Sequence, residues 1–148
     1  MIRPVKNLYT LGCLNLDSRP TGISKLSACR SEKIQVEAFT YYAKLRRLAD
    51  YCRENYCEAI GLQQAANIAN LERTYFSTYF RQKVGVCFNC WLATVRIEHA
   101  KEHLKDGDCT ISTIAGKVGF GTLSTFERTF KRCTNMTASQ YRKQVRPF

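Results

Sequence analysis

Hydrogen-bonding side chains are concentrated between residues 123 and 132, on one face of an expected helix. Opposite Phe126 and Phe130, that face carries Leu123, Ser124, Glu127, Arg128 and Lys131. The guanidinium fork of Arg128 matches the O6 and N7 acceptors of guanine in the major groove of DNA. The carboxylate of Glu127 can accept a hydrogen bond from N4 of cytosine, or it can pair with Arg128. These residue types favour the reading of base edges, with a phosphate contact or a solvated charge as the alternatives for Arg128.

A second set of polar residues lies fifty positions earlier, on a helix expected over Arg73–Lys83. Phe76 and Phe80 point inward there, and the opposite face carries Arg73, Thr74, Ser77, Thr78 and Arg81. The hydroxyl groups of Thr74, Ser77 and Thr78 fit a close approach to bases. In the later set, Ser124 can add a hydrogen bond and Leu123 a contact with a thymine methyl group.

Four of the exposed cations are expected to bind phosphates rather than bases: Arg73, Arg81, Lys131 and Arg132. For each candidate residue the ordinary alternative is a solvated helix face. Their position opposite a Phe pair, in both sets, favours the contact role. The Phe pairs themselves, with Trp91 and Tyr141, are expected in the core.

The two sets belong to an internal repeat. At an offset of fifty, four residues of the first copy have a counterpart: Phe76 and Phe126, Phe80 and Phe130, Gly85 and Asn135, Trp91 and Tyr141. Asn70 stands where the second copy has Gly119, and these two residue types best tolerate a left-handed backbone at a helix end. Each copy therefore predicts a helix-turn-helix unit, a motif that places one helix in a DNA major groove.

The remaining helices follow from apolar spacing and capping residues. One amphipathic helix is expected between Ile34 and Gly61, with an apolar stripe formed by Tyr41, Leu45, Leu48, Ala49, Cys52 and Tyr56. A long helix is expected from Phe88 through Leu104, with Ala93, Ile97, Ala100 and Leu104 inward. N-caps are expected at Thr110 and Thr122, and Thr137 with Gln140 has the form of a capping box.

The predicted fold class is all-α, with about seven helices in two helix-turn-helix lobes joined by a long linker helix. The expected divisions are a lead of unknown role (1–33), a first lobe (34–88), the linker helix (89–105) and a second lobe (106–148).

Residues from about 40 to 144 resemble the DNA-binding domain of the AraC/XylS family of bacterial transcription regulators. Most of the resemblance lies in the second copy, at Ile114, Ala115, Val118, Gly119, Phe120, Ser124, Phe126, Arg128, Phe130, Lys131, Arg132, Thr137, Tyr141 and Arg142. Arg96, Ala100 and Leu104 match the family's linker helix. The chain departs from the family pattern at Glu72, His103, Asn135 and Ala138, where Ser, an apolar residue, Gly and Pro are usual.

The resemblance implies two recognition helices in successive major grooves of promoter DNA, with RNA polymerase as a further partner. We accordingly expect an activator that binds as a monomer, and we expect no cofactor. Because only about 40 residues precede the match, we expect a short, domain-only member with no domain for a small-molecule effector.

Composition agrees with a polyanionic partner. The formal net charge is +11, and residues 110–148 contribute +6 of it with seven Lys or Arg and one acid. No run of signal-peptide or membrane-spanning length is present in the sequence. We therefore expect a soluble cytoplasmic protein, bound to the bacterial nucleoid and without a membrane partner.

Two rival functions remain open. Cys87, Cys90, His99 and His103 superficially resemble zinc-ligand spacing. However, nine residues along one helix separate Cys90 from His99 by ~13 Å, too far for one tetrahedral ion. We therefore expect no metal and reduced, inert thiols, with a thiol or zinc sensor as the weaker alternative. Cys13 and Cys29 do not form the paired motifs of relatives that carry a zinc-bound thiol.

The other rival is an interaction module of the same fold, with weak DNA affinity, which binds polymerase or another regulator. The first expected recognition helix, polar but only modestly basic, keeps this alternative open. The sequence contains no phosphate loop, nucleophile elbow or convincing acid/base pair, so we expect no catalysis.

Overall fold

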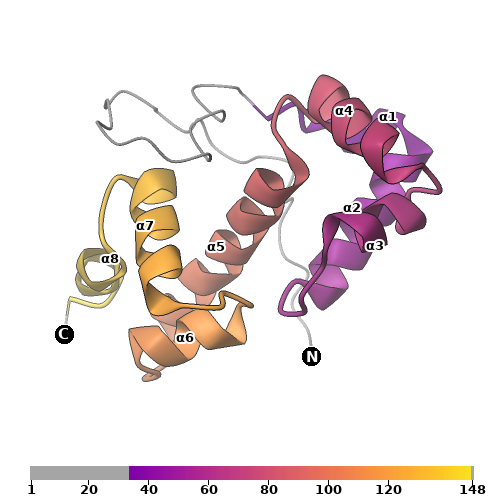
Figure 1. Ribbon diagram of the computed structural model, residues 1–148. Helices are drawn as coiled ribbons and strands as arrows, with labels where there is room; N and C mark the ends of the chain where they lie inside the picture. Colours follow the sequence, from indigo (N-terminus) through magenta and orange to yellow (C-terminus); the bar gives the residue numbers. More distant parts are fainter. Residues whose placement is uncertain (1–33, 148) are drawn as a thin grey trace.

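A computed structural model describes residues 34–147, and within this range all regular structure is helical (Figure 1). The helices are α1 (Glu37–Tyr41), α2 (Ala43–Asn55), α3 (Leu62–Ile68), α4 (Arg73–Val84), α5 (Phe88–Asp106), α6 (Ile111–Lys117), α7 (Leu123–Thr134) and α8 (Ala138–Val145). The expected all-α class is confirmed, with eight helices in the described range against about seven expected. The lead expected over residues 1–33 lies outside the described residues.

Helix α1 accounts for the additional element, and it corrects one expected core residue. The backbone of Tyr42 is extended, with ψ 110°, so the single helix expected from Ile34 to Gly61 is broken there into α1 and α2. The break leaves Tyr41 82% exposed rather than in the core. Phe39 is buried instead, and its ring stacks on Trp91 with centroids 5.0 Å apart. Helical spacing alone could not locate this break.

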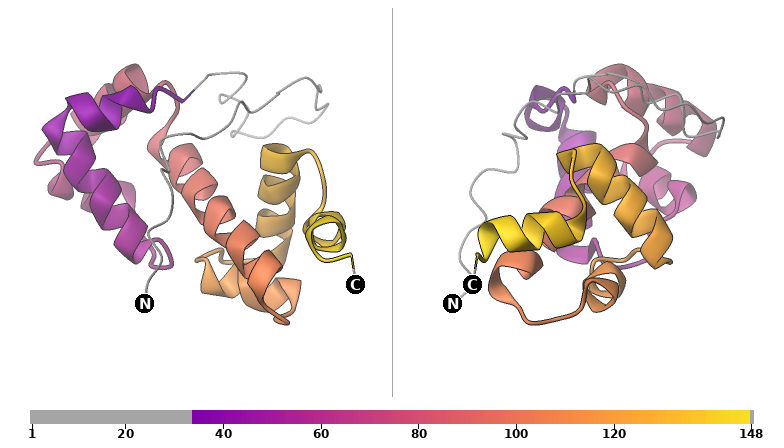
Figure 2. Two further views of the ribbon diagram at one scale, coloured as in Figure 1. Left: turned by 180° about the vertical axis from the view of Figure 1, so that it is seen from behind. Right: turned by 90° about the vertical axis from the view of Figure 1, so that its left-hand side faces the viewer.

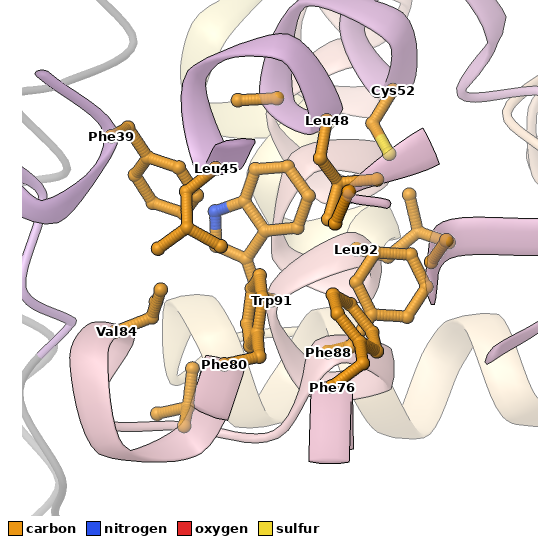
Figure 3. Packing of buried hydrophobic residues seen from close by; sticks show 14 of the residues in the cluster. Phe39, Leu45, Leu48, Cys52, Phe76, Phe80, Val84, Phe88, Trp91 and Leu92 are labelled. Atoms are coloured by element: carbon orange, nitrogen blue, oxygen red, sulfur yellow. The ribbon is translucent and has the colours of Figure 1, made fainter. Parts of the chain in front are cut away.

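A first hydrophobic cluster joins α1 to α4 with the start of α5. Figure 3 shows the Trp91 indole among Phe39, Leu45 and Phe80, with Phe76 and Phe88 beside them. Phe76 and Phe80 are completely buried, as expected from their spacing of four. The cluster fixes the inner side of α4, so the opposite side of that helix must face solvent.

A second cluster joins the rest of α5 to α6, α7 and α8. Phe126 and Phe130 are completely buried in it, together with Ile97, Ala100 and Leu104 of α5. Helix α5 changes clusters within its length: Val95 packs in the first and Ile97 in the second. Ala93, expected inward, is only half-buried, because the first half of α5 turns Trp91, Leu92 and Val95 to the core.

The turns of the repeat have the backbone conformation that the sequence predicts. Asn70 and Gly119, in equivalent turns, have φ of 53° and 91°. Gly85 and Asn135, at the ends of α4 and α7, have φ of 91° and 59°. Both positions therefore require a left-handed residue, and each copy supplies it once with Gly and once with Asn.

None of the helices in the described range combines the length and the apolar content that a membrane crossing requires.

Candidate functional site

Helix α7 is held so that its polar face is open to solvent. Its first turn is capped by Thr122, whose Oγ1 accepts a hydrogen bond from the Thr125 N–H at 3.2 Å. Its inner face is fixed by Phe126 and Phe130. The structure consequently exposes every α7 residue that the sequence singled out: Leu123, Ser124, Glu127, Arg128, Lys131 and Arg132.

Glu127 and Arg128 do not pair with each other in the part of the chain that the structure describes. The structure therefore does not contain the ion pair with Arg128, which is one of the two interpretations of Glu127. Both side chains remain available to a ligand on the solvent side of α7. A carboxylate among three cations and a serine hydroxyl on this face would repel a phosphate but could accept a hydrogen bond from a base amino group.

Helix α4 is positioned in the same way, by a different cap. The carboxylate of Glu72 accepts a hydrogen bond from the Tyr75 N–H at 3.0 Å. Backbone N–H groups of Thr74 and Tyr75 hold the pKa of this exposed carboxyl below its usual value. Glu72, where the family usually has Ser, thus serves as a cap. The candidate residues on α4 are all exposed: Arg73, Thr74, Ser77, Thr78 and Arg81.

The two exposed helices lie on the same side of the molecule. In the right-hand view of Figure 2, α4 and α7 lie toward one side, and α1 and α8 lie toward the other. Helix α5 runs between the two lobes and buries residues in both clusters (Figure 1).

Tyrosines beside the α4 face were missed by the sequence reasoning. Tyr75 is 57% exposed, and its ring lies 5.8 Å from that of Tyr79 one turn later. Tyr42 packs edge-on against Tyr79, and Lys83 Nζ lies 4.9 Å from the centre of the Tyr42 ring. The signal was present as a Tyr pair four residues apart, off the stripe of Phe76 and Phe80. The second lobe has no aromatic residue at the matching positions, which are Thr125 and Thr129.

The residues of the rejected zinc pattern have structural roles. Cys87 caps α5, its Sγ accepting a hydrogen bond from the Cys90 N–H at 3.4 Å. His99 lies further along α5, stacked on Tyr56. Among residues 34–147, no group of three or more His, Cys, Asp or Glu side chains is arranged to hold a metal ion.

Comparison with known proteins places residues 65–144 within a family model described as a helix-turn-helix domain. An uncharacterised HTH-type transcriptional regulator of Staphylococcus aureus is 36% identical over 99 residues, covering 67% of this chain. YijO of Escherichia coli, another uncharacterised HTH-type regulator, is 32% identical over 124 residues, covering 82% of this chain. The chain spans 13% of the length of the first relative and 44% of the second.

Solved structures with a similar fold include two DNA-binding or C-terminal domains of regulators. The DNA-binding domain of AdpA, a transcriptional factor solved in complex with a target DNA, aligns with a TM-score of 0.64 at 25% identity. That alignment covers 70% of this chain and 96% of AdpA's. The C-terminal domain of AraT, a response regulator of Geobacillus stearothermophilus, aligns with a TM-score of 0.63 at 28% identity, covering 68% and 84% of the two chains.

Proposed function

The chain belongs to the AraC/XylS family of helix-turn-helix transcriptional regulators, and on that premise we propose that it is a sequence-specific, double-stranded DNA-binding transcription regulator. Helices α4 and α7 would enter successive major grooves on one face of the duplex. The observation that carries the proposal is that α4 and α7 lie toward the same side of the molecule and each exposes polar residues opposite a buried Phe pair.

The charge distribution and the solved relatives support this proposal. Residues 110–148, which include α7, have a net charge of +6, as a partner of the phosphate backbone requires. The AdpA domain, similar over 70% of this chain, was solved with a target DNA. A monomer has both recognition helices and could bind an asymmetric site without a second copy.

Each candidate residue has a proposed role. Arg128 would read a guanine through O6 and N7, and Glu127 a cytosine N4. Leu123 and Ser124 would contact the same segment, and three residues would read the neighbouring groove: Thr74, Ser77 and Thr78. Phosphate contacts would come from Arg73, Arg81, Lys131 and Arg132. We further propose that the protein is an activator which contacts RNA polymerase near a promoter, as the family resemblance implies.

We also propose a division of the chain into two lobes and a linker helix that contributes residues to both clusters. The first lobe would comprise residues 34–88 and the second 106–148, with 89–105 as the linker helix. Each lobe contains one complete pair of helices, α3 with α4 and α6 with α7.

Selection of bound duplexes from a random pool tests the proposal. We expect the full chain to enrich a motif of two short blocks about one helical turn apart, ~10 base pairs. Enrichment of a single block would contradict the use of both helices. No enrichment over the starting pool would contradict sequence-specific binding itself.

A second candidate function is an interaction module of the same fold, with weak DNA affinity. Two observations favour it: residues 34–109 have a net charge of only +1, and Tyr41 and Tyr75 are exposed in that region. A mobility shift of the selected duplex with an excess of random-sequence competitor separates the two. Binding that resists the competitor supports the proposed regulator, whereas binding that is lost supports the interaction module.

A further inference from the structure

Arg96 lies at the point of α5 where the two hydrophobic clusters meet. Val95 before it packs in the first cluster, and Ile97 after it packs in the second. The residue is half-buried, so part of its guanidinium is removed from water and is stabilised by acceptors within the protein. The acceptors it uses are some 40 residues earlier in the chain.

Among the described residues, both hydrogen bonds of the Arg96 side chain go to the loop that follows α2. Its Nε donates to the Tyr56 carbonyl at 2.7 Å, and its Nη2 donates to the Glu58 carbonyl at 2.7 Å. Carbonyl groups at the end of a helix have no partner within the helix and carry partial negative charge. A fork of two N–H donors with a full positive charge suits such a pair of acceptors.

The turn of the second helix-turn-helix unit lies against the same loop. A Cβ atom built on Gly119 would be 2.9 Å from each of the Tyr56 and Cys57 carbonyl oxygens and 3.1 Å from Arg96 Nε. Real Cβ atoms essentially never come that close to a backbone oxygen. The second unit therefore approaches the first lobe to backbone contact at this point.

Tyr56 completes the contact between the lobes. It packs against both hydrophobic clusters, and its ring stacks on His99 of α5. The end of α2 is thus held from three directions: by Arg96, by His99 and by the turn at Gly119. Two of these contacts come from α5 and the third from the turn between α6 and α7, so the end of α2 is tied to both the linker helix and the second lobe.

We infer that Arg96 is a positioning residue which, with Tyr56 and Gly119, fixes the second helix-turn-helix unit against the first and so sets the half-site spacing that the chain accepts. The inference rests on the proposed function and adds a specificity determinant that never touches DNA. The affinity gained by linking two DNA-binding units is greatest when the distance between the units matches the distance between the two half-sites. It falls when the half-sites are closer together or further apart. A rigid linkage gives a narrow spacing preference, and a loosened one gives a broad preference with a lower maximum.

The test uses the full chain and the duplex that the wild-type protein enriches from a random pool. Base pairs are inserted or deleted between the two blocks, and the affinity is measured at each spacing. We expect the wild type to lose about tenfold or more when the spacing changes by two base pairs. Arg96→Met keeps the aliphatic stem and removes both hydrogen bonds, and it should reduce that discrimination to about twofold. Arg96→Lys, which can reach one carbonyl, should lie between them.

Arg142→Met is the matched control. Arg142 Nη2 also donates to a loop carbonyl, that of Cys109 at 2.5 Å, but both groups belong to the second half of the chain. Arg142→Met should lower the melting temperature and leave the spacing profile unchanged. A duplex with one block alone should bind wild type and Arg96→Met equally.

The outcomes are distinguishable. A spacing profile that stays equally sharp in folded Arg96→Lys or Arg96→Met overturns the inference alone. Equal flattening by Arg142→Met also overturns it, because general destabilisation would then be the cause. If the wild type enriches no duplex, the proposed function fails and takes the inference with it.

Discussion

The ring of Tyr56 stacks on the imidazole of His99, with ring centres 3.7 Å apart and planes 4° from parallel. His99 is half-buried by this arrangement, and no hydrogen-bond partner reaches its Nε2 in the described part of the chain. Burial lowers the pKa of His99 below the ordinary 6.5, and the nearby His103 lowers it further, while Glu102 and Glu98 act in the opposite direction.

This lowered pKa predicts a stability that falls with acidity. The unfolded chain binds a proton at His99 more readily than the folded chain does, so falling pH favours unfolding. The contribution of neutral His99 to the free energy of unfolding should be complete above about pH 6.5, and the free energy of unfolding should decrease below that pH. Urea unfolding between about pH 7.5 and 5.5 measures the decrease.

His99→Gln should remove part of that decrease. His103→Gln removes only the neighbouring charge, which is the smaller of the two causes, so it should remove less of the decrease than His99→Gln does. If His99→Gln and wild type lose the same stability over this range, the stacked imidazole is not the titrating group.

Arg128→Ala should relax specificity at one base pair, because the exposed guanidinium is proposed to bind both acceptors of a guanine. The expected cost is about 1–3 kcal/mol on the preferred duplex and little on a duplex already changed at that position. Affinities for the single-base variants of the selected duplex measure this. Arg132→Ala, at a residue proposed to bind phosphate, is the control. If Arg128→Ala lowers the affinity equally for every duplex, Arg128 contacts a phosphate rather than a base.

Lys131→Ala should weaken binding uniformly on all sequences. Loss of one phosphate contact should reduce the slope of log affinity against log salt by about one. Lys143, also exposed but on α8 at the other side of the molecule, provides the matched substitution Lys143→Ala. That control should keep the wild-type slope, and an unchanged slope in Lys131→Ala would remove Lys131 from the interface.

Asn135→Ala should destabilise the second lobe. Asn135 has a φ of 59°, and alanine is strained there because it has a Cβ atom and no side-chain group that could form a local hydrogen bond. The expected loss is about 1–2 kcal/mol in urea unfolding, whereas Asn135→Gly should stay within about 0.5 kcal/mol of wild type. Asn89→Ala, within the first turn of α5, controls for loss of an Asn side chain as such. Equal loss in Asn135→Ala and Asn135→Gly would assign the effect to side-chain contacts rather than to the backbone.

Thiol reactivity should differ between Cys52 and Cys57. Burial raises the pKa of the Cys52 thiol to about 12, so very little thiolate forms near neutral pH. Cys57 is exposed at the end of the same segment. Iodoacetamide followed by peptide mass spectrometry should label Cys57 in the native protein and Cys52 only after denaturation. Prompt native labelling of Cys52 would revive the thiol-sensor alternative.

The repeat explains why much of the fold could be predicted from the sequence. Phe pairs four residues apart and a left-handed residue at each turn are local rules, and both copies obey them. The caps at Thr110, Thr122 and Thr137 are also local, and each accepts the expected hydrogen bond from the residue three positions on.

What the sequence could not predict depends on contacts between distant residues. The break at Tyr42 places Phe39 on Trp91, 52 residues away, and no spacing rule contains that pairing. The same holds for Arg96, whose acceptors lie 40 and 38 residues earlier. The exposed face of α7 could be predicted because Phe126 and Phe130 define its opposite side. The Tyr pair beside α4 is visible in the sequence, but Tyr spacing alone does not distinguish a core position from a surface one.

The exchange of Gly and Asn between the two copies bears on how such a protein can change its target. At both turn positions the backbone needs a positive φ and not a particular side chain. Either copy can therefore change in sequence there without altering the directions of its helices. One unit can therefore acquire a new preference while its twin continues to hold the old site. A duplicated fold of this kind allows regulatory targets to evolve in half-steps.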